Sequence, residues 1–424
     1  MKLVTLLVGI AAVSISLSAS AQSTLELRFS NPLSMVRADE PVVLFRTSLE
    51  RKGLKVPSGK YLSVAYTTGE LIPVQLDDLN NDGQWDEAAL LLNFQPNESK
   101  AILVSITDQV VSIGAPRAHV RHMRKQADNS FGPDLRIDSV PPGQPATDFA
   151  VTKLPPFLTE GPAWENDKVG FRLYFDVRNG KDIWGKTTTS MVMDQVGRDT
   201  KTSYHDRASW GMDVLKVGKS LGAGALALLV PVNGKDTMVR LGGLNMGKII
   251  YEKIADGPVR AMFRLTYPNW KVLAGAPPVS LTEEITIWGG QYYTESKVTV
   301  SHAPKGSSVV TGIVNLKSKA VVNLDVEKVK GIYTFDKQSE NSDLLGMAVL
   351  LPPGQKAVSG QTPNAGTDIT QTYFVATPVG KEPFVFRFYA GWEQSESFFR
   401  SAASFDVYLN EQARRWASPV KGNK

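Results

Sequence analysis

A block of alternating apolar and polar residues at 171–179 carries the side chains best suited to chemistry in this chain. In a strand, residues at i, i+2 and i+4 share a face. One face would then present two guanidinium groups, a phenol and a carboxylate, a set that fits an anionic, hydroxyl-rich ligand. A solvated sheet face with cross-strand ion pairs explains the pattern equally well. The four residues are Arg172, Tyr174, Asp176 and Arg178.

Tyr204 and His205 form a second candidate set, shortly before Trp210. Histidine and tyrosine are two of the side chains that can move a proton at a sugar carbon. On a regular strand the two would face opposite ways, so only one of them would line a site. A histidine satisfied within a turn is the plainer interpretation, and composition alone favours it.

Loops at both ends of the charged block offer further candidates, because sites are built on loops that a rigid sheet positions. Tryptophans there could stack on a sugar ring, although each is individually more typical of a core. Nearby acidic groups could hold sugar hydroxyls, and a lysine could add positive potential. These candidates are Trp164, Glu165, Asp167, Trp184, Trp210 and Lys216.

The loop at 78–86 has the spacing of a calcium-binding loop, with oxygen-bearing side chains at alternating positions and Gly83 at the sharp turn. Ala89 stands where an EF-hand has its glutamate, so this is not an EF-hand. A tight Asx turn joining two strands is the alternative. A calcium ion here would fix a hairpin rather than do chemistry. The candidate ligands are Asp78, Asn80, Asp82, Gln84 and Asp86.

Composition and absent motifs remove several classes of function. The chain has no cysteine, which excludes thiol catalysis and cysteine-ligated metals. Its net charge of +5 is mild and its lysines and arginines are dispersed, which argues against nucleic acid. There is no Gly-x-Ser-x-Gly elbow, phosphate-binding glycine loop or His-Glu-x-x-His motif. His119 and His122 could bind a metal, but no third ligand is evident and a flexible loop is favoured there. No organic cofactor and no protein partner are indicated.

Residues 1–21 predict a cleaved secretory signal: Lys2, an apolar stretch and a small-residue site before Gln22. We therefore expect a periplasmic or secreted protein, and no later segment resembles a spanning helix. Residues 22–419 predict one large antiparallel β-sandwich, with a hairpin at 71–94 and an irregular loop segment at 117–156. Phe405–Trp416 is the one convincing helix.

Several blocks of the sequence form a recognisable set: Gln75–Asp78, Asp82-Gly83, Trp85–Glu87, Glu160–Pro162, Glu165–Asp167, the charged block, Asp182–Lys186, Tyr204-His205, Trp210–Gly218, Ser220–Gly222 and Tyr389–Glu393. These blocks resemble a secreted bacterial family, domain-of-unknown-function family 4861. The resemblance implies a β-supersandwich related to galactose mutarotases and β-sandwich polysaccharide lyases. It also implies that at least one member is an oligosaccharide dehydratase, which removes water from a non-reducing-end uronate in ulvan-type fragments.

The resulting hypothesis is a carbon–oxygen lyase that performs β-elimination at the terminal uronate of an acidic oligosaccharide. Arg172 and Arg178 would neutralise the carboxylate, which makes the C5 proton more acidic. Tyr204 and His205 would serve as base and acid, with Tyr174 in reserve. A lyase that cleaves a 4-linked uronate needs the same chemistry with a sugar leaving group. A sugar-binding protein without turnover is the alternative from another class.

Overall fold

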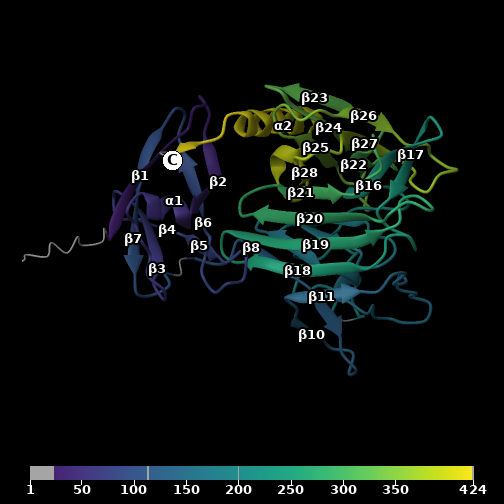
Figure 1. Cartoon of the computed structure of the whole chain (residues 1–424), viewed down its shortest axis with the longest axis horizontal. Helices are drawn as coiled ribbons and strands as arrows, with labels where there is room; N and C mark the ends of the chain where they lie inside the picture. The colour runs from purple at the N-terminus through teal and green to yellow at the C-terminus, as the bar shows by residue number, and fades with distance from the viewer. Residues whose placement is uncertain (1–22, 112–113, 199, 423–424) are drawn as a thin grey trace, which may run out of the picture.

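A computed structural model describes residues 23–111, 114–198 and 200–422, so the predicted signal peptide lies outside the described residues. The expected all-β architecture is confirmed, and the sheets are antiparallel. No helix among the described residues is long and apolar enough to cross a membrane. The view in Figure 1 separates an N-terminal lobe, coloured purple to blue, from a larger body.

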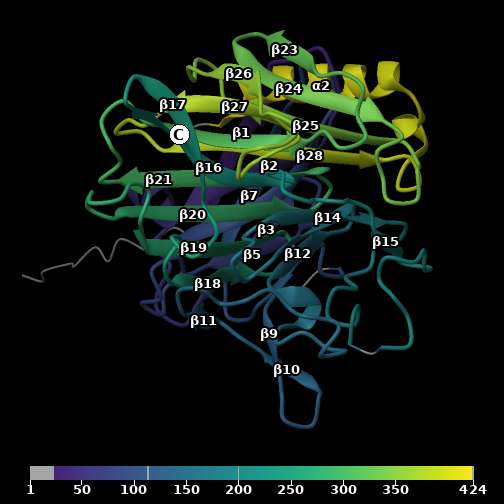
Figure 2. The ribbon, with the colours of Figure 1, turned by 90° about the vertical axis from the view of Figure 1, so that its right-hand side faces the viewer.

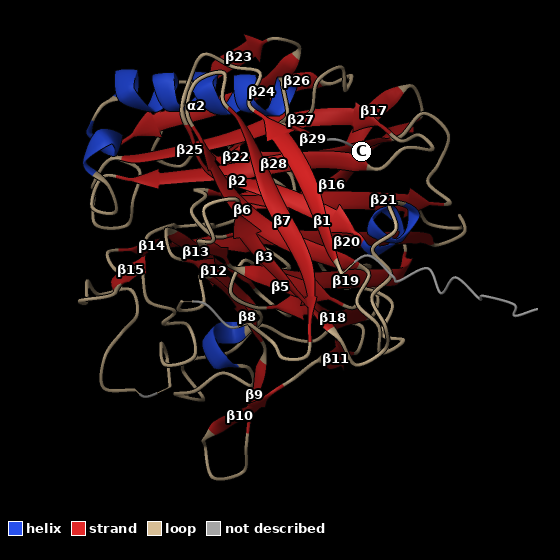
Figure 3. Ribbon diagram, turned by 90° about the vertical axis from the view of Figure 1, so that its left-hand side faces the viewer, coloured by secondary structure: helices blue, strands red, loops and turns tan. Residues whose placement is uncertain are grey.

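The N-terminal lobe is a small sandwich with its own core. Alternating apolar residues on its strands, such as Leu62, Val64, Ile102 and Val104, point inward and are buried. Figure 3 shows this lobe in front of the body. One sheet has the order β29 (Lys421–Gly422), β1 (Thr24–Ser30), β7 (Ser99–Thr107), β3 (Tyr61–Tyr66), β4 (Leu71–Ile72); the other has β2 (Arg37–Phe45), β6 (Glu87–Phe94), β5 (Val74–Asp77). The hairpin expected at 71–94 is therefore present, as β5 and β6.

The body contains a nine-stranded and a five-stranded sheet that share the largest apolar core, to which Leu228, Phe263, Leu281 and Phe388 belong. The larger sheet has the order β11 (Ile137–Val140), β18 (Ile249–Asp256), β19 (Arg260–Trp270), β20 (Val279–Trp288), β21 (Tyr293–Ser301), β28 (Phe384–Trp392), β25 (Leu345–Leu351), β24 (Val329–Asp336), β23 (Val322–Val326). The smaller has β17 (Lys235–Arg240), β16 (Ala223–Val232), β22 (Ser308–Val314), β27 (Thr372–Pro378), β26 (Val358–Gln361).

A third sheet of the body carries several of the predicted site residues, and Figure 2 shows its strands β12, β14 and β15 to the right of β19 and β20 of the nine-stranded sheet. Its order is β15 (Gly211–Asp213), β14 (Lys181–Lys186), β13 (Val169–Leu173), β12 (Ala163–Asn166), β8 (Ala118–Arg121). A two-stranded ribbon, β9 (Met123–Lys125) and β10 (Phe131–Asp134), projects nearby (Figure 2).

The C-terminal helix α2 (Ala402–Ala417) confirms the predicted helix and buries Phe405 and Leu409 against the nine-stranded sheet. Ser401 caps it by accepting a hydrogen bond from the backbone N–H of Ser404. The chain then returns to the N-terminal lobe, where β29 pairs with β1 (Figure 1).

Three sequence expectations need correction. The alternation at 171–179 is not one strand: β13 ends at Leu173, and the following residues form a turn. The segment 117–156 is not irregular or a flexible loop throughout, because it contains β8 to β11. A short helix, α1 (Arg46–Arg51), was not expected, and its single buried residue, Leu49, gives it little sequence periodicity. Two 3-10 turns complete the elements, Leu158–Glu160 and Ser397–Arg400.

Candidate functional site

The sheet β15–β14–β13–β12–β8 carries charged side chains on the face opposite the main core. The register pairs Arg172 with Asp182, and Trp184 with Asp213. Directly opposed residues share a face, and so do residues at i and i+2. Arg172, Asp182 and Asp213 therefore lie on one face, while Phe171 on the other packs into the core.

The segment 187–210 covers this charged face. Met193 and Val196 pack with Trp184 in a small apolar cluster, to which Tyr204 and Trp210 are added at the edge. Arg172, Asp182 and Asp213 are consequently buried. Buried charges are unfavourable unless they are paired and hydrogen-bonded, so the partners of these groups determine what the cluster can do.

Arg172 is the centre of the cluster and is fully buried. Its Nη2 lies 2.6 Å from Asp182 Oδ2 and 2.7 Å from Asp213 Oδ2, and it donates to the Tyr174 hydroxyl at 2.8 Å. Its Nη1 lies 3.3 Å from the Tyr204 hydroxyl. With no exposed surface, Arg172 does not bind a substrate carboxylate directly as the sequence suggested. It holds two carboxylates and two phenols in place.

Asp182 and Asp213 crowd the same guanidinium nitrogen. Burial and the neighbouring Asp182 raise the pKa of Asp213 well above its usual value, although Arg172 opposes that shift. Two carboxyl groups so close favour sharing a proton. Sequence reasoning did not single out either residue as a site residue. The signal available in the sequence was alternation for Asp182 only, since Asp182, Trp184 and Lys186 alternate on β14 with Ile183 and Gly185.

His205 connects the buried cluster to solvent. Its side chain is 55% exposed, and its Nδ1 lies 3.6 Å from Asp213 Oδ2. Its ring packs on that of Tyr204, with the two centroids 4.6 Å apart. Burial, together with the positive charge of Arg172, lowers the pKa of His205 below 6.5. The imidazole is therefore neutral near pH 7 and can accept a proton.

The two candidate tyrosines occupy different positions. Tyr174 lines a pocket with His205, and its hydroxyl donates to Asp182 Oδ2 at 2.9 Å. Tyr204 lies behind His205, where it packs on Trp184. Burial raises the pKa of both phenols, against the opposing effect of Arg172. Both therefore keep their protons at neutral pH, and Tyr174 is the one placed at the pocket.

Arg178 and Asp176 lie in the turn after β13, not on the strand. The Arg178 Nε lies 3.0 Å from Asp176 Oδ1, and its Nη2 lies 2.7 Å from Glu160 Oε1. The guanidinium carbon of Arg178 lies 4.0 Å from the centroid of the Tyr174 ring. Arg178 remains 35% exposed, so it can still meet a ligand. Glu160, which sequence reasoning missed as a site residue, has a positive φ of 67°.

These residues border a pocket of about 320 Å³ at the end of the sheet. Its wall is rich in cationic side chains, and Lys216 is exposed there. Arg240 and Glu340, neither predicted, complete it from β17 and from the loop after β24. The lining consists of Tyr174, Arg178, Gly180, His205, Leu215, Lys216, Val217, Gly218, Arg240 and Glu340.

The remaining predicted site residues lie elsewhere. The Trp164 indole faces the core and donates to Thr294 Oγ1 at 3.0 Å, so it cannot stack on a sugar. Glu165 is buried against Lys186. Asp167 pairs with Arg117 at 2.7 Å. Neither acidic group lines the pocket, so neither takes the expected role of orienting groups or holding a sugar there. Trp184 is buried beneath Tyr204, with Trp210 beside it, so these two tryptophans support the site from behind.

The carboxylates of the Asp78–Asp86 loop accept hydrogen bonds from backbone N–H groups of the same loop. Asp78 accepts from the backbone N–H of Gly83 at 2.8 Å, and Asp86 accepts from that of Leu79 at 2.8 Å. In the same way, Asn80 Oδ1 accepts from the backbone N–H of Asp82, and Asp82 Oδ1 accepts from that of Gln84. Among the described residues, no group of three or more His, Cys, Asp or Glu is placed to hold a metal ion. Calcium at this loop stays a prediction. The two loop histidines are not a metal pair either, because His119 contacts Asp194 and Asp256 whereas His122 contacts Asp138.

Comparison with known proteins identifies the family. Residues 29–421 match the model described as "Domain of unknown function (DUF4861)", and the chain belongs to this family. It is similar to "Uncharacterized protein P7" of Formosa agariphila, with 23% identity over 295 residues, 65% of this chain and 70% of that protein.

Two solved structures from Enterococcus faecalis align with the chain, an alpha-mannosidase and a protein in glycosyl hydrolase family 38. Each gives a TM-score of 0.49 at 10% identity and covers 94% of this chain. The alignments cover 46% and 47% of those chains, so this chain spans less than half the length of either.

Proposed function

We propose that this protein is a carbon–oxygen lyase that eliminates water from the non-reducing-end uronate of an acidic oligosaccharide, with ulvan-type fragments as the favoured substrate. The observation that carries the proposal is the placement of a neutral, half-exposed His205 between a buried Asp213 and a cationic pocket. The resemblance to β-supersandwich sugar enzymes supports the same chemistry.

The substrate carboxylate would bind at the cationic wall. Arg178 and Lys216 both line the pocket, and both are at least partly exposed. A carboxylate paired with these groups withdraws charge from C5, and the developing enolate is stabilised by the same cations. Arg172 contributes from behind by fixing the hydroxyl groups of Tyr174 and Tyr204.

His205 would act as the base. Its Nδ1 faces Asp213, which leaves Nε2 for the C5 proton of the uronate. Asp213 would hold the ring in place, and the single negative charge that it shares with Asp182 would favour the imidazolium that forms, so Asp213 is a positioning residue. In this assignment the C5–H bond breaks, its electron pair forms the C4=C5 double bond, and the C4–O bond breaks.

Tyr174 would protonate the departing 4-hydroxyl, which leaves as water. Its raised pKa keeps the proton on the phenol until the leaving oxygen becomes basic. The phenolate formed is stabilised by Arg172, 2.8 Å from its oxygen. Proton transfer from His205 to Tyr174 through solvent then restores both groups. A bulkier sugar leaving group would give a lyase by the same steps.

The test uses the mature chain with uronate-terminated oligosaccharides, sulfated and plain. Ultraviolet absorbance follows the conjugated uronate, and mass spectrometry follows chain length. A product lighter by one water at unchanged length is expected. Chain scission would mean a lyase, and binding without any product would overturn the enzyme in favour of a sugar-binding protein.

His205→Ala is the decisive variant for the assignment. General base catalysis contributes roughly 10²–10⁴-fold to rate, and a loss in that range is expected. His302→Ala is the matched control, since His302 is also exposed but lies at the end of β21, outside the pocket. Full activity in both variants would contradict the role of His205.

A further inference from the structure

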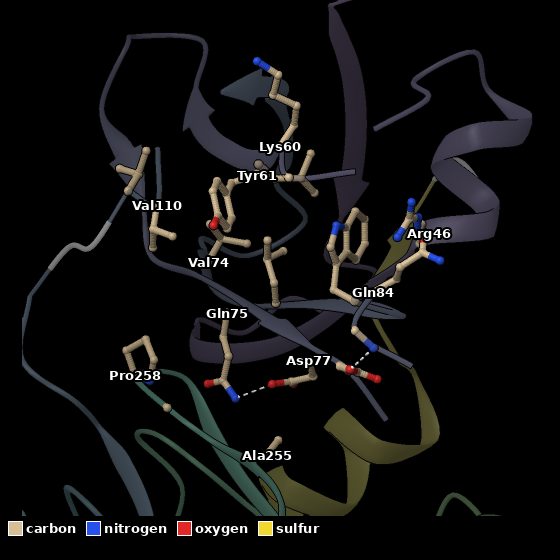
Figure 4. A pocket seen from close by; sticks show the side chains of 18 of the residues that line it. Arg46, Lys60, Tyr61, Val74, Gln75, Asp77, Gln84, Val110, Ala255 and Pro258 are labelled. Atoms are coloured by element: carbon tan, nitrogen blue, oxygen red, sulfur yellow. Dashed lines mark hydrogen bonds between the residues drawn. The ribbon is translucent and has the colours of Figure 1, made fainter. Parts of the chain in front are cut away.

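A second pocket lies where the N-terminal lobe meets the body, separate from the candidate site. Its volume is about 610 Å³, within the range of small-molecule sites. Figure 4 shows Tyr61, Gln75 and Asp77 of the lobe facing Ala255 and Pro258 of the body. None of the residues that line the His205 pocket lines this one.

The floor of this pocket is rigid. The Gln75 side chain accepts from the backbone N–H of Val259 at 2.9 Å and donates to the Arg260 carbonyl at 2.9 Å. Gln75 also donates to Asp77 at 2.7 Å, drawn as a dashed line in Figure 4, and Asp77 accepts from Arg260 Nε at 2.7 Å. These bonds join lobe and body, so the pocket is formed before any ligand arrives.

The acidic groups around the pocket are already bonded within the protein. Asp77 is bonded to Arg260, Asp78 accepts backbone N–H groups of its own loop, and Asp256 pairs with His119. The pocket therefore offers a ligand few free hydrogen-bond acceptors. A ligand that binds here must instead carry acceptors for the donors of the pocket.

Donors and aromatic rings, by contrast, remain available. The indole Nε1 of Trp85 is buried without a hydrogen-bond partner among the described residues, and Trp85 as a whole is nine-tenths buried. Arg46 lies over its ring at 5.4 Å and so fixes the indole. Tyr61 is half-buried in the wall, and Arg136 is exposed and forms no ion pair within the described part of the chain. Gln84 presents an exposed amide.

We propose that this interlobe pocket is a second, non-catalytic binding site for an acidic oligosaccharide. A sugar ring would pack on Tyr61, its hydroxyls would accept from the Gln84 amide, and a carboxylate or sulfate would pair with Arg136. The choice of an acidic saccharide rests on the proposed function, whereas the need for a ring with many acceptors comes from the pocket itself.

The experiment measures calorimetric binding of three probes to the full mature chain in the His205→Ala background, which blocks turnover. The probes are hexameric oligogalacturonate, an ulvan oligosaccharide of similar length, and neutral cellohexaose. Binding at two sites is expected for an acidic probe, with one site lost when Tyr61→Ala and Arg136→Ala are combined. Arg136→Ala alone should weaken that site by roughly tenfold, the range for losing a charged hydrogen bond.

The control variant is Lys330→Ala, because Lys330 is 54% exposed on β24, outside this pocket. It should leave binding unchanged. Unchanged binding in Tyr61→Ala/Arg136→Ala would overturn the proposal, and equal affinity for cellohexaose would overturn the acidic class.

Turnover distinguishes this proposal from the proposed function. With His205 intact, Tyr61→Ala/Arg136→Ala should convert short oligosaccharides at the wild-type rate. In a different outcome, neither the wild type nor the Tyr61→Ala/Arg136→Ala variant converts any substrate, while the two substitutions still remove one binding site. That result would support the second binding site and overturn the proposed dehydratase activity.

Discussion

Two buried ionic clusters lie on the same face of the β15–β14–β13–β12–β8 sheet, and they differ in how completely their groups are satisfied. At one end, Glu165 pairs with Lys186, and its Oε1 accepts from the backbone N–H groups of Val192 and Met193, each at 2.7 Å. Lys186 also donates to the carbonyl of Ser190 at 2.8 Å. This cluster is closed and fixes the covering segment 187–210.

The Arg172 cluster at the other end is crowded instead. Two carboxylates contact one guanidinium nitrogen, Arg172 Nε has no partner among the described residues, and the pKa of Asp213 is raised. Perturbed buried groups of this kind are typical of functional sites. The Glu165 cluster is closed within the fold, whereas the Arg172 cluster opens to solvent through His205, and the proposed function assigns chemistry to the second cluster only.

The largest effect on stability is expected from Glu165→Ala. The substitution leaves the Lys186 cation buried and two backbone N–H groups unpaired, so the free energy of unfolding should fall by about 3–5 kcal/mol. Denaturant unfolding measures this. Glu26→Ala, which removes an exposed ion pair with Arg28, is the control and should change stability by less than about 1 kcal/mol. Equal losses of unfolding free energy in Glu165→Ala and Glu26→Ala would contradict the structural role of the Glu165 cluster.

Asp213→Asn tests the crowded cluster. At neutral pH the folded state disfavours the Asp213 carboxylate, so an amide of the same shape should leave the free energy of unfolding nearly unchanged or raise it. Turnover should nevertheless fall, because the amide carries no share of the negative charge that lies beside Nδ1 of His205. Unfolding and rate are measured on the same preparation. A stability loss as large as that of Glu165→Ala would assign Asp213 to folding.

The pKa values of His119 and His205 are shifted in opposite directions, so the two histidines should give different pH dependences. Burial alone would lower the pKa of His119, but hydrogen bonds to Asp194 and Asp256 outweigh it and raise the pKa to about 10. Its stabilising contribution is therefore complete below pH 6.5 and is lost as the pH rises through about 10. For His205, whose pKa is lowered, the acid limb of kcat/KM should lie below pH 6.5.

These pH effects are measured by unfolding and rate profiles. His119→Asn should flatten the alkaline part of the stability profile and leave the acid limb of the rate in place. If the acid limb instead lies above pH 6.5, His205 is not the neutral base.

The smallest effect is expected at the exposed Asp78–Asp86 loop, where calcium would neutralise carboxylates already bonded to the backbone. Added calcium should raise the melting temperature by a few degrees relative to a chelator, roughly 1 kcal/mol of stabilisation. Asp82→Ala should abolish the difference without changing turnover. If calcium does not change the melting temperature, the loop is an Asx turn that binds no calcium.

The all-β class, the 71–94 hairpin and the C-terminal helix could be predicted, because period-2 alternation and helix caps are local signals. The position of Arg172 could not. Its neighbours on the strand suggested an open face, and only the later segment 187–210 folds back to bury it. Sequence alternation states which residues share a face, but not what covers that face.

The same limit explains why some predicted site residues line the pocket whereas others lie elsewhere in the fold. Tyr174, His205, Arg178 and Lys216 were predicted and do line one pocket. Glu165 and Trp164, close to them in sequence, belong to a closed ion pair and to the core. Asp182 and Asp213 enter the site through cross-strand register, which a single sequence does not reveal.

The most direct test of the central claim uses an oligosaccharide whose terminal uronate carries deuterium at C5. Mass spectrometry of the product reports whether that atom is removed. β-Elimination with His205 as the base predicts a product without the deuterium, formed more slowly than from the undeuterated substrate and not formed by His205→Ala. A dehydrated product that retains the C5 deuterium would contradict β-elimination at this pocket.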